Sequence, residues 1–463
     1  MNIKPTSDET ISGASRAIQS RERSCREALE ACLARIDEDE ARCRAWVSVD
    51  RVGALRRAAE LDAELAAGHW RGPLHGIPIG IKDIVNVAGW PTQAGAEWFA
   101  AEWVALSQAA GPHPGPLPGG EGAEGLALRD APIVARLREA GAVFVGKTVT
   151  TQFASFDPPV TRNPWNPDRT PGGSSSGSAA AVAVGMCLGA LGSQTGGSIT
   201  RPASYCGVAG CKPTFGLVNS EGIVPLAPNM DHPGPIARTV RDLALLLDVI
   251  AGERQNELGV VAALDGSPTA PPRLGRLGGI FDMLAGEEVR SSFTIALDRL
   301  SRAGAVVLSV PLPPSFAEVI ARHRTIMAVE AAAWHESLLA SHPNGYRPKI
   351  RSLMEEGFRT LAPEYVHCCE HQARLSREML ACFDHADVLV TPATPAPAPD
   401  TSTTGDPSFN SPWSYTGLPT VSFPVGLSRD GLPLAIQLIG KPNTEPALFR
   451  AAAWCESVIQ ADV

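Results

Sequence analysis

The sequence lacks the features of several common protein classes. It has no excess of positive charge, because 49 Asp and Glu residues outnumber 40 Lys and Arg residues, for a formal net charge of −9. This excess of acid argues against general binding to nucleic acids or to anionic membranes. Apolar residues make up 44% of the chain, which is typical of a globular protein with a large core. We expect no transmembrane span.

Paired cysteines, a leader and a metal motif are also missing. The ten cysteines form no C-x-x-C pair, and the first residues, MNIKPTSDETISG, contain no apolar core of a signal peptide. We therefore expect a cytoplasmic protein without a disulfide framework. In the cluster His367, Cys368, Cys369 and His371, only the two histidines have the spacing that shares a helix face, so we predict no metal site.

Two glycine-rich clusters that carry serines stand out in the middle of the chain. They are GGSSSGS at residues 172–178 and TGGSI at residues 195–199, and one helix of small residues separates them. Glycine lets the backbone turn tightly and bring its N–H groups against a ligand, while a serine hydroxyl can attack or relay protons. The arrangement predicts a site.

A base for these serines is not found among the histidines, since none of the ten lies inside either cluster. A serine hydroxyl is a weak nucleophile and needs a base within hydrogen-bond reach. Lys82 lies in the apolar run GIPIGIKDIV, where an amine is out of place unless it is paired or neutral. Burial that lowers its pKa by several units would let it accept a proton.

Taken in order, these motifs resemble the amidase signature family of serine hydrolases. The resemblance rests on GIPIGIKD, GGSSSGS, TGGSI and CGVAGCKPT, and it extends over about residues 72–441 through segments such as DHPGPIARTVRDLALLLDVIAG and ADVLVTPATPAPAP. It implies an amidase that cleaves a carboxamide C–N bond through a serine acyl-enzyme, with no cofactor and no metal. The expected partner is a small-molecule amide, bound by a monomer or a homodimer.

The resemblance also assigns roles to individual residues. It implies that Ser198 is the acyl nucleophile, that Ser174 is a bridging serine after a cis peptide bond, and that Lys82 is the terminal base. Retention of all three speaks against a catalytically silent scaffold. The TGGS turn offers four consecutive N–H groups with two positions free of side chains, which suits an oxyanion. The residues implied for this oxyanion hole are Thr195, Gly196 and Gly197.

Two departures from the commonest family pattern bear on the substrate. Many members carry an acidic residue where this chain has Gln194, and the arginine that usually follows the nucleophile by two positions follows it by three, as Arg201. The second variant resembles the malonamidase-like branch. Arg201 and Gly173 are the predicted substrate-binding residues, because a guanidinium suits a substrate carboxylate. The alternative is an internal ion pair between Arg201 and an acidic side chain.

Three other assignments compete with this one. An A-like subunit of a glutamine-dependent amidotransferase usually carries the acidic residue that is absent here. The G-x-S-x-G match at residues 173–177 would make Ser175 the nucleophile of an α/β-hydrolase-type esterase, but the preceding NPWNPDRTPG contains no strand. GAVFVGKT at residues 141–148 matches a phosphate-binding loop, but its apolar centre is typical of a buried strand. We therefore predict that Lys147 is structural or solvated.

Alternating strands and helices from residue 76 to 248 predict a single α/β/α domain with a mixed central β-sheet flanked by helices. Residues 1–70 are predicted to form an N-terminal helical arm, and residues 71–463 the catalytic domain. A Pro/Gly-rich insertion at about 108–127 is predicted to be disordered. A helical segment at about 317–384 matches the family least, and we expect it to set substrate choice.

The last part of the chain combines strands with an irregular stretch. PTVSFPVGL and PLAIQLIG are predicted strands, and residues 390–413 are too rich in proline for regular structure. Since loops on a rigid scaffold often carry function, we expect this stretch to run near the site.

Overall fold

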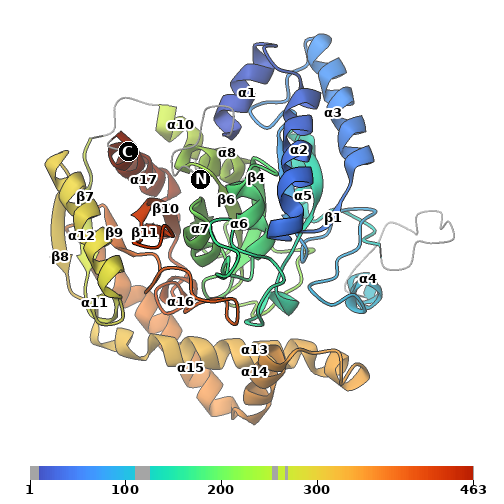
Figure 1. Cartoon of the computed structure of the whole chain (residues 1–463). Helices are drawn as coiled ribbons and strands as arrows, with labels where there is room; N and C mark the ends of the chain where they lie inside the picture. Colours follow the sequence, from blue (N-terminus) through green and yellow to red (C-terminus); the bar gives the residue numbers. More distant parts are fainter. Residues whose placement is uncertain (1–9, 110–125, 253–258, 266–269, 462–463) are drawn as a thin grey trace.

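One mixed β-sheet of 11 strands forms the centre of the computed structural model (Figure 1), which describes residues 10–109, 126–252, 259–265 and 270–461. The strand order is β1-β3-β2-β4-β6-β5-β10-β11-β9-β7-β8. Both parallel and antiparallel pairs occur, so the prediction of a mixed sheet is confirmed. The strands are β1 (Trp46–Val49), β2 (Pro78–Lys82), β3 (Val143–Thr148), β4 (Gly189–Gln194), β5 (Ala209–Lys212), β6 (His232–Ala237), β7 (Arg273–Leu277), β8 (Val306–Val310), β9 (Val388–Pro392), β10 (Thr420–Leu427) and β11 (Pro433–Ile439).

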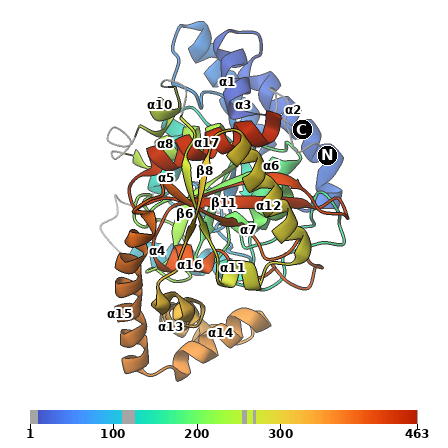
Figure 2. The ribbon, with the colours of Figure 1, turned by 90° about the vertical axis from the view of Figure 1, so that its left-hand side faces the viewer.

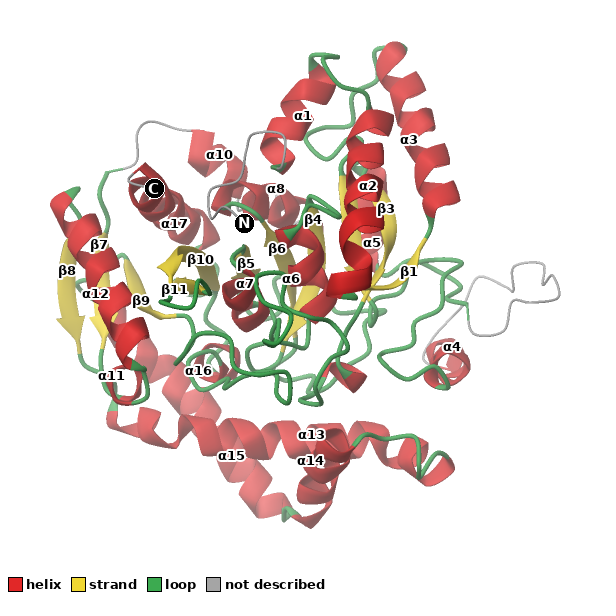
Figure 3. Cartoon of the chain, viewed as in Figure 1, coloured by secondary structure: helices red, strands yellow, loops and turns green. Residues whose placement is uncertain are grey.

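Helices cover both faces of this sheet (Figures 1 and 3). On one face α6 (Ser176–Ala183) packs against α7 (Thr200–Cys206), and on the other α17 (Glu445–Ala461) packs against α8 (Val240–Ile250) and α12 (Glu287–Arg302). The remaining helices are α1 (Ile11–Gln19), α2 (Cys25–Cys43), α3 (Arg51–Ala66), α4 (Phe99–Ala109), α5 (Pro132–Glu139), α10 (Val260–Asp265), α11 (Ile280–Met283), α13 (Val319–Ser341), α14 (Pro348–Arg359), α15 (Ala362–Glu378), α16 (Ser411–Tyr415) and the 3₁₀ turns η2 (Gln152–Ala154), η4 (Pro314–Glu318) and η5 (Met379–Phe383).

The strand β2 lies between two parallel neighbours, β3 and β4. All of its residues are buried, as expected for a parallel strand whose two faces are both covered by helices. Because parallel strands end at the same edge of a sheet, β2 brings Lys82 to the edge where β4 ends in Gln194. Residues Val143–Thr148 of the match to a phosphate-binding loop form β3 itself, so that assignment is wrong, as the sequence predicts.

Within residues 10–70 the structure contains three helices, α1, α2 and α3, and one strand. Between α2 and α3, β1 pairs antiparallel with β3 and extends the sheet, with Trp46 opposite Thr148. Its sequence, Trp-Val-Ser-Val, is rich in the aromatic and β-branched residues that favour strands. The arm therefore contributes to the sheet as well as packing on it. Most of the predicted insertion at 108–127 lies outside the described residues.

The predicted helical segment at about 317–384 forms α13, α14 and α15, which extend from one end of the molecule (Figure 2). Its connection between α13 and α14 is held by the side chain of Gln152. The amide nitrogen of Gln152 donates to the carbonyl of Gly345 at 2.8 Å, and its oxygen accepts from the N–H of Arg347 at 2.6 Å. Since Gln152 begins the 3₁₀ turn η2 that follows β3, this clamp fixes the helical segment relative to the sheet edge that ends in Lys82.

Candidate active site

Lys82 and Ser174, predicted as a base and a bridging serine, are in direct contact. The amine of Lys82 donates to the Ser174 hydroxyl at 2.7 Å and to the Ser193 hydroxyl at 2.9 Å. Both Lys82 and Ser174 are fully buried. The amine thus has two neutral hydroxyl partners and no contacting carboxylate among the described residues.

Burial changes the proton affinity of this amine. Removal from water lowers the pKa of Lys82 to about 7, and the carboxylate of Asp231 opposes this change through its charge. The cause is the cost of burying an ammonium ion in a medium of low polarity. Near neutral pH a substantial fraction of the amine is therefore unprotonated and able to accept a proton.

The two glycine clusters lie against each other at this edge of the sheet. The peptide bond between Gly173 and Ser174 is cis, as the resemblance implies. The N–H of Ser175 donates to the carbonyl of Ser198 at 3.2 Å, and the carbonyl of Ser174 accepts from the N–H of Thr151 at 3.3 Å. The first bond joins the Ser174 loop to the turn that carries Ser198, and the second joins it to the segment that follows β3.

Ser198 stands just before α7 and is more accessible than its predicted partners. It retains 7% of its surface, whereas Lys82 and Ser174 retain none. Ser198 therefore lies nearer to the surface than the other two groups. This order of depth is what a nucleophile followed by a buried relay requires.

The turn that leads into Ser198 is anchored by its neighbours. The Thr195 hydroxyl donates to the Asp231 carboxylate at 2.5 Å. Gly197 has no room for a side chain, because an added Cβ would lie 2.7 Å from the side-chain oxygen of Asn410. Gly196 is less confined, with its closest neighbour at 3.4 Å from such an atom. Bulk at Gly197 would therefore displace the turn.

Gln194, where many family members carry an acid, binds both sides of this turn. Its side-chain oxygen accepts from the N–H groups of Ile199 and Thr200, each at 3.0 Å. Its amide nitrogen donates to the Ser414 hydroxyl at 3.4 Å. A carboxylate could accept the first two bonds but could not donate the third, so this chain uses the amide to link α7 to α16.

The two predicted substrate-binding residues, Arg201 and Gly173, contact each other. Arg201 is buried, and one terminal nitrogen donates to the Gly173 carbonyl at 2.8 Å and to the Thr404 hydroxyl at 3.1 Å. Its Nε and other terminal nitrogen have no hydrogen-bond partner among the described residues. Burial lowers the pKa of Arg201. Thr404 also confirms that the proline-rich stretch 390–413 runs beside the site.

The serine of the competing esterase assignment points elsewhere. The Ser175 hydroxyl donates to the carbonyl of Ser193 at 3.3 Å and accepts from the N–H of the same residue at 3.2 Å. Ser175 is fully buried, and no strand precedes it directly. A hydroxyl occupied by β4 backbone in this way has no access to a substrate, which argues against a nucleophile elbow.

The metal-like cluster on α15 has other contacts. His371 binds the hydroxyl of Tyr415 at 2.8 Å through one ring nitrogen and the carbonyl of Ser315 at 3.0 Å through the other. Across the part of the chain that the structure describes, no group of three or more His, Cys, Asp or Glu side chains is arranged to hold a metal ion.

A small cavity of about 60 Å³ lies beside the predicted catalytic groups, where Ser193, Thr195 and Asp231 contribute to its wall. A second, larger pocket of about 680 Å³ extends toward Trp103 and Trp334. The two spaces share four lining residues, Ser220, Ile223, Pro225 and Pro228. Apolar room for part of a substrate is therefore available next to the site.

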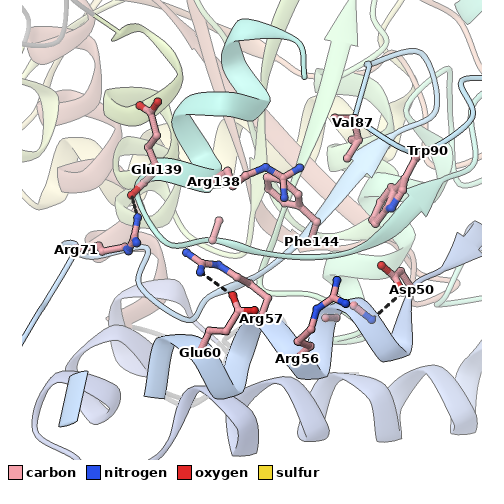
Figure 4. Close-up of a pocket in the computed structure, with 14 residues that line it drawn as sticks. Asp50, Arg56, Arg57, Glu60, Arg71, Val87, Trp90, Arg138, Glu139 and Phe144 are labelled. Carbon is pink, nitrogen blue, oxygen red and sulfur yellow. Dashed lines mark hydrogen bonds and ion pairs between the residues drawn. The ribbon is translucent and has the colours of Figure 1, made fainter. Parts of the chain in front are cut away.

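A separate pocket of about 510 Å³, shown in Figure 4, contains none of the predicted site residues. Four arginines line it, but three of them are paired with acidic side chains, which offsets their charge. These pairs are Arg57 with Glu60 at 3.0 Å, Arg71 with Glu64 at 2.5 Å and Arg138 with Asp130 at 2.7 Å. The pocket therefore has little net attraction for an anion.

Three contributors to the site were not predicted from the sequence: Ser193, Asp231 and His323. Asp231 is the first residue of DHPGPIARTV, a segment that carries part of the family resemblance. The sequence motif could therefore have indicated Asp231 as a site residue. His323 lies in the least matched segment, and it binds the carbonyl of Thr195 at 2.8 Å across 128 positions of sequence. No local pattern could have revealed that contact.

Known proteins resemble the whole chain. The family model described as Amidase matches residues 27–105 and 123–449. An amidase of Pseudomonas putida is 34% identical over 96% of this chain and 94% of its own, and the A subunit of the glutamyl-tRNA(Gln) amidotransferase of Koribacter versatilis is 31% identical over 98% of both. The solved native peptide amidase of Stenotrophomonas maltophilia superposes with a TM-score of 0.79 and 29% identity over 97% of both chains.

Within the described residues, no helix is both long enough and apolar enough to cross a membrane.

The family model covers most of the chain in two consecutive blocks, and the P. putida relative matches the chain almost from end to end. The motifs, the fold and these similarities agree. This chain belongs to the amidase family, the amidase signature group of serine hydrolases that its motifs resemble.

Proposed function

We propose that this chain hydrolyses a carboxamide C–N bond through an acyl-enzyme on Ser198, with Ser174 and Lys82 as the proton relay. The observation that carries the proposal is the 2.7 Å contact between the buried amine of Lys82 and the hydroxyl of Ser174. A lysine whose pKa is lowered by burial can serve as a base where no histidine is in place.

In the acylation step, the Ser198 oxygen attacks the carbonyl carbon of the amide. Ser174 takes the proton from Ser198 and delivers a proton to the nitrogen that leaves, while Lys82 exchanges protons with Ser174. The C–N bond breaks as the amine departs, and an ester to Ser198 remains. The N–H groups of the turn Thr195, Gly196 and Gly197 would stabilise the oxyanion, and losing one such donor typically costs about 2.7 to 4 kcal/mol.

In the deacylation step, water replaces the amine. The relay removes a proton from the water molecule as it attacks the ester carbon, and Ser198 recovers its hydroxyl proton when it leaves. The products are a carboxylic acid and ammonia or an amine. No metal or organic cofactor enters this scheme.

Arg201 gives the strongest indication of the substrate class. Two of its nitrogens lack a partner among the described residues, although the side chain is buried beside the Gly173–Ser174 loop. A substrate carboxylate on the acyl side would satisfy donors that are otherwise unpaired. We therefore favour an amide that also bears a carboxylate, as the similarity to the malonamidase-like branch implies.

An amidotransferase A-like subunit remains the second candidate, because the K. versatilis relative bears that name. Gln194 argues against it, since the acidic residue usual in that branch is absent. The discriminating observation is whether the purified chain alone releases ammonia. Activity on glutamine that appears only with a second subunit would favour the amidotransferase.

The test is an ammonia-release assay over a panel of small dicarboxylic monoamides, urea-type amides, glutamine and aryl amides. Ser198→Ala should abolish turnover of the best substrate, while the matched change Ser175→Ala should retain it. A fluorophosphonate adduct should map by mass spectrometry to the peptide that contains Ser198. An adduct on Ser175, or loss of turnover only in Ser175→Ala, would overturn the proposal.

A further inference from the structure

We propose that His323 on α13 is a positioning residue that holds the oxyanion turn in its working orientation. This inference rests on the proposed function, because it concerns the same turn that would stabilise the tetrahedral intermediate. It extends the role of the helical segment 317–384 from substrate choice to the chemical step.

The contact between His323 and the turn is short and buried. The ring Nε2 lies 2.8 Å from the carbonyl oxygen of Thr195, and the side chain is almost fully buried, with 3% of its surface exposed. Since a carbonyl oxygen can only accept, Nε2 carries the hydrogen and donates it. Burial lowers the pKa of His323 to about 4, so the ring is neutral at ordinary assay pH.

This bond sets the direction of a catalytic N–H group. The carbonyl of Thr195 and the N–H of Gly196 belong to one peptide unit, and in a trans peptide these two groups point in opposite directions. No cis bond is found at this position. Fixing the carbonyl toward α13 therefore aims the N–H of Gly196 away from α13.

The next two peptide units of the turn are held in the same manner by other elements. The carbonyl of Gly196 accepts from the Ser414 hydroxyl on α16 at 3.4 Å. The carbonyl of Gly197 accepts from the N–H of Arg201 in α7 at 2.9 Å. Three successive carbonyls thus have donors from three different helices, and the N–H groups of the same peptide units, those of Gly196, Gly197 and Ser198, point away from these donors.

External anchors are needed because the turn itself is weakly constrained. Gly196 and Gly197 have no side chains, and glycine has the widest choice of backbone conformations. At Gly196 an added Cβ would find no atom closer than 3.4 Å, so packing alone does not confine that residue. Of the three carbonyl bonds, the one from His323 is the shortest and acts on the residue just before this flexible position.

The helix that carries His323 is itself fixed to the body of the protein. The Glu330 carboxylate on α13 accepts from the N–H of Asn229 at 3.0 Å. Asn229 lies two positions before Asp231 in the sequence. After the C-terminal end of α13, Gln152 clamps the connection from α13 to α14 at Gly345. A donor on a support held at its middle and beyond its C-terminal end can orient a loop, as a catalytic site requires.

The experiment compares three variants of His323 with a matched control on the same helix. His323→Leu removes the donor at similar volume, His323→Gln keeps an N–H donor, and His323→Asn keeps a donor that is too short to reach. His335→Leu is the control, because His335 is also buried but binds the Tyr346 hydroxyl at 3.0 Å instead of the turn. Each variant is measured for kcat, KM, melting temperature and the rate of fluorophosphonate labelling at Ser198.

We expect His323→Leu to lower kcat about 10- to 100-fold with KM within about threefold, since a misdirected donor should cost somewhat less than a deleted one. Labelling of Ser198 should slow in parallel, because the phosphoryl oxygen occupies the oxyanion position. His323→Gln should recover kcat to within about fivefold. If His323→Leu does not fold, His323→Asn should show the same loss of kcat.

Two results would overturn the inference. One is an unchanged kcat and labelling rate in His323→Leu or His323→Asn. The other is an equal loss of kcat in His335→Leu, which would show a general effect of disturbing α13. Failure of the proposed function looks different, because then the wild-type protein would not be labelled at Ser198.

Discussion

Two buried lysines on neighbouring strands of the sheet have opposite surroundings. Lys147 on β3 contacts the Asp83 carboxylate at 3.1 Å, the carbonyl of Val85 at 2.8 Å and the Thr92 hydroxyl at 3.1 Å. Lys82 on β2 contacts only hydroxyls among the described residues, those of Ser174 and Ser193. Both are almost completely excluded from solvent.

The difference lies in which protonation state each environment favours. Burial lowers the pKa of both amines, but in Lys147 the contact with the Asp83 carboxylate opposes that effect directly. A contacting carboxylate stabilises an ammonium ion, whereas a hydroxyl can bind either form of the amine. Burial alone therefore does not make a lysine a base. Lys212 on β5 is equally buried and its amine donates to the carbonyl of Pro213 at 3.1 Å, without a contacting carboxylate among the described residues. The feature that distinguishes Lys82 is therefore its contact with the Ser174 hydroxyl, and we assign catalysis to Lys82 and structure to Lys147.

The largest effect is expected when the catalytic lysine is removed. Lys82→Met should lower kcat by at least about 10³-fold, because the three members of the relay act as a unit. Its melting temperature should stay the same or rise, since a buried amine is replaced by an apolar chain of similar length. Turnover assays and calorimetry check both parts. Wild-type turnover in this variant would remove Lys82 from the mechanism.

The opposite pattern is expected for the structural lysine. Lys147→Met leaves the Asp83 carboxylate buried without its partner and should cost about 3 to 5 kcal/mol of stability. Its kcat per folded molecule should fall far less than that of Lys82→Met. The double variant Lys147→Met/Asp83→Asn should regain part of the stability in denaturant titrations. A stable single variant without turnover would contradict the comparison.

Arg201 is a third buried cation and tests whether an unpaired donor serves the substrate. Arg201→Ala should weaken kcat/KM for carboxylate-bearing amides by about 2 to 4 kcal/mol, while neutral amides of matched size lose much less. The measurement is a pair of specificity constants for each class. Equal losses, together with a lower melting temperature, would show that Arg201 only supports the Gly173 carbonyl.

The smallest effect concerns the distant charge that acts on Lys82. Asp231 is the carboxylate that raises the pKa of this lysine, so it favours the ammonium form. Asp231→Asn should lower the pKa of Lys82. The acid limb of the pH profile of kcat/KM should then move to lower pH by up to about one unit. A limb that stays in place or moves to higher pH would mean that Asp231 has no such influence.

The sequence predicted those parts of the fold that depend on local pattern. The apolar runs of β2, β3, β10 and β11 were predicted as strands, and the helices of the segment 317–384 were also predicted, because period and composition are local properties. The strand β1 was missed, since its four residues lie between two strong helical patterns. What made them a strand is pairing with β3, which is distant in sequence.

In the candidate site, too, residues in local motifs could be predicted, whereas residues that depend on distant contacts could not. Lys82, Ser174 and Ser198 could be chosen because each lies in a distinctive motif, and Lys82 and Ser174 indeed meet although 92 positions separate them. His323 could not be chosen, because its role depends on where α13 crosses the turn. The contact between Lys147 and Asp83 likewise could not be predicted, because it depends on how β3 packs beside the end of β2.

The pH dependence of fluorophosphonate labelling at Ser198 shows whether Lys82, and not Lys147, is the terminal base that exchanges protons with Ser174. The labelling rate should rise with pH through about 7, near the pKa of Lys82. This rise should persist in folded Lys147→Met/Asp83→Asn and disappear in Lys82→Met. A rise that survives in Lys82→Met, or that disappears when only Lys147 and Asp83 are replaced, would contradict the account.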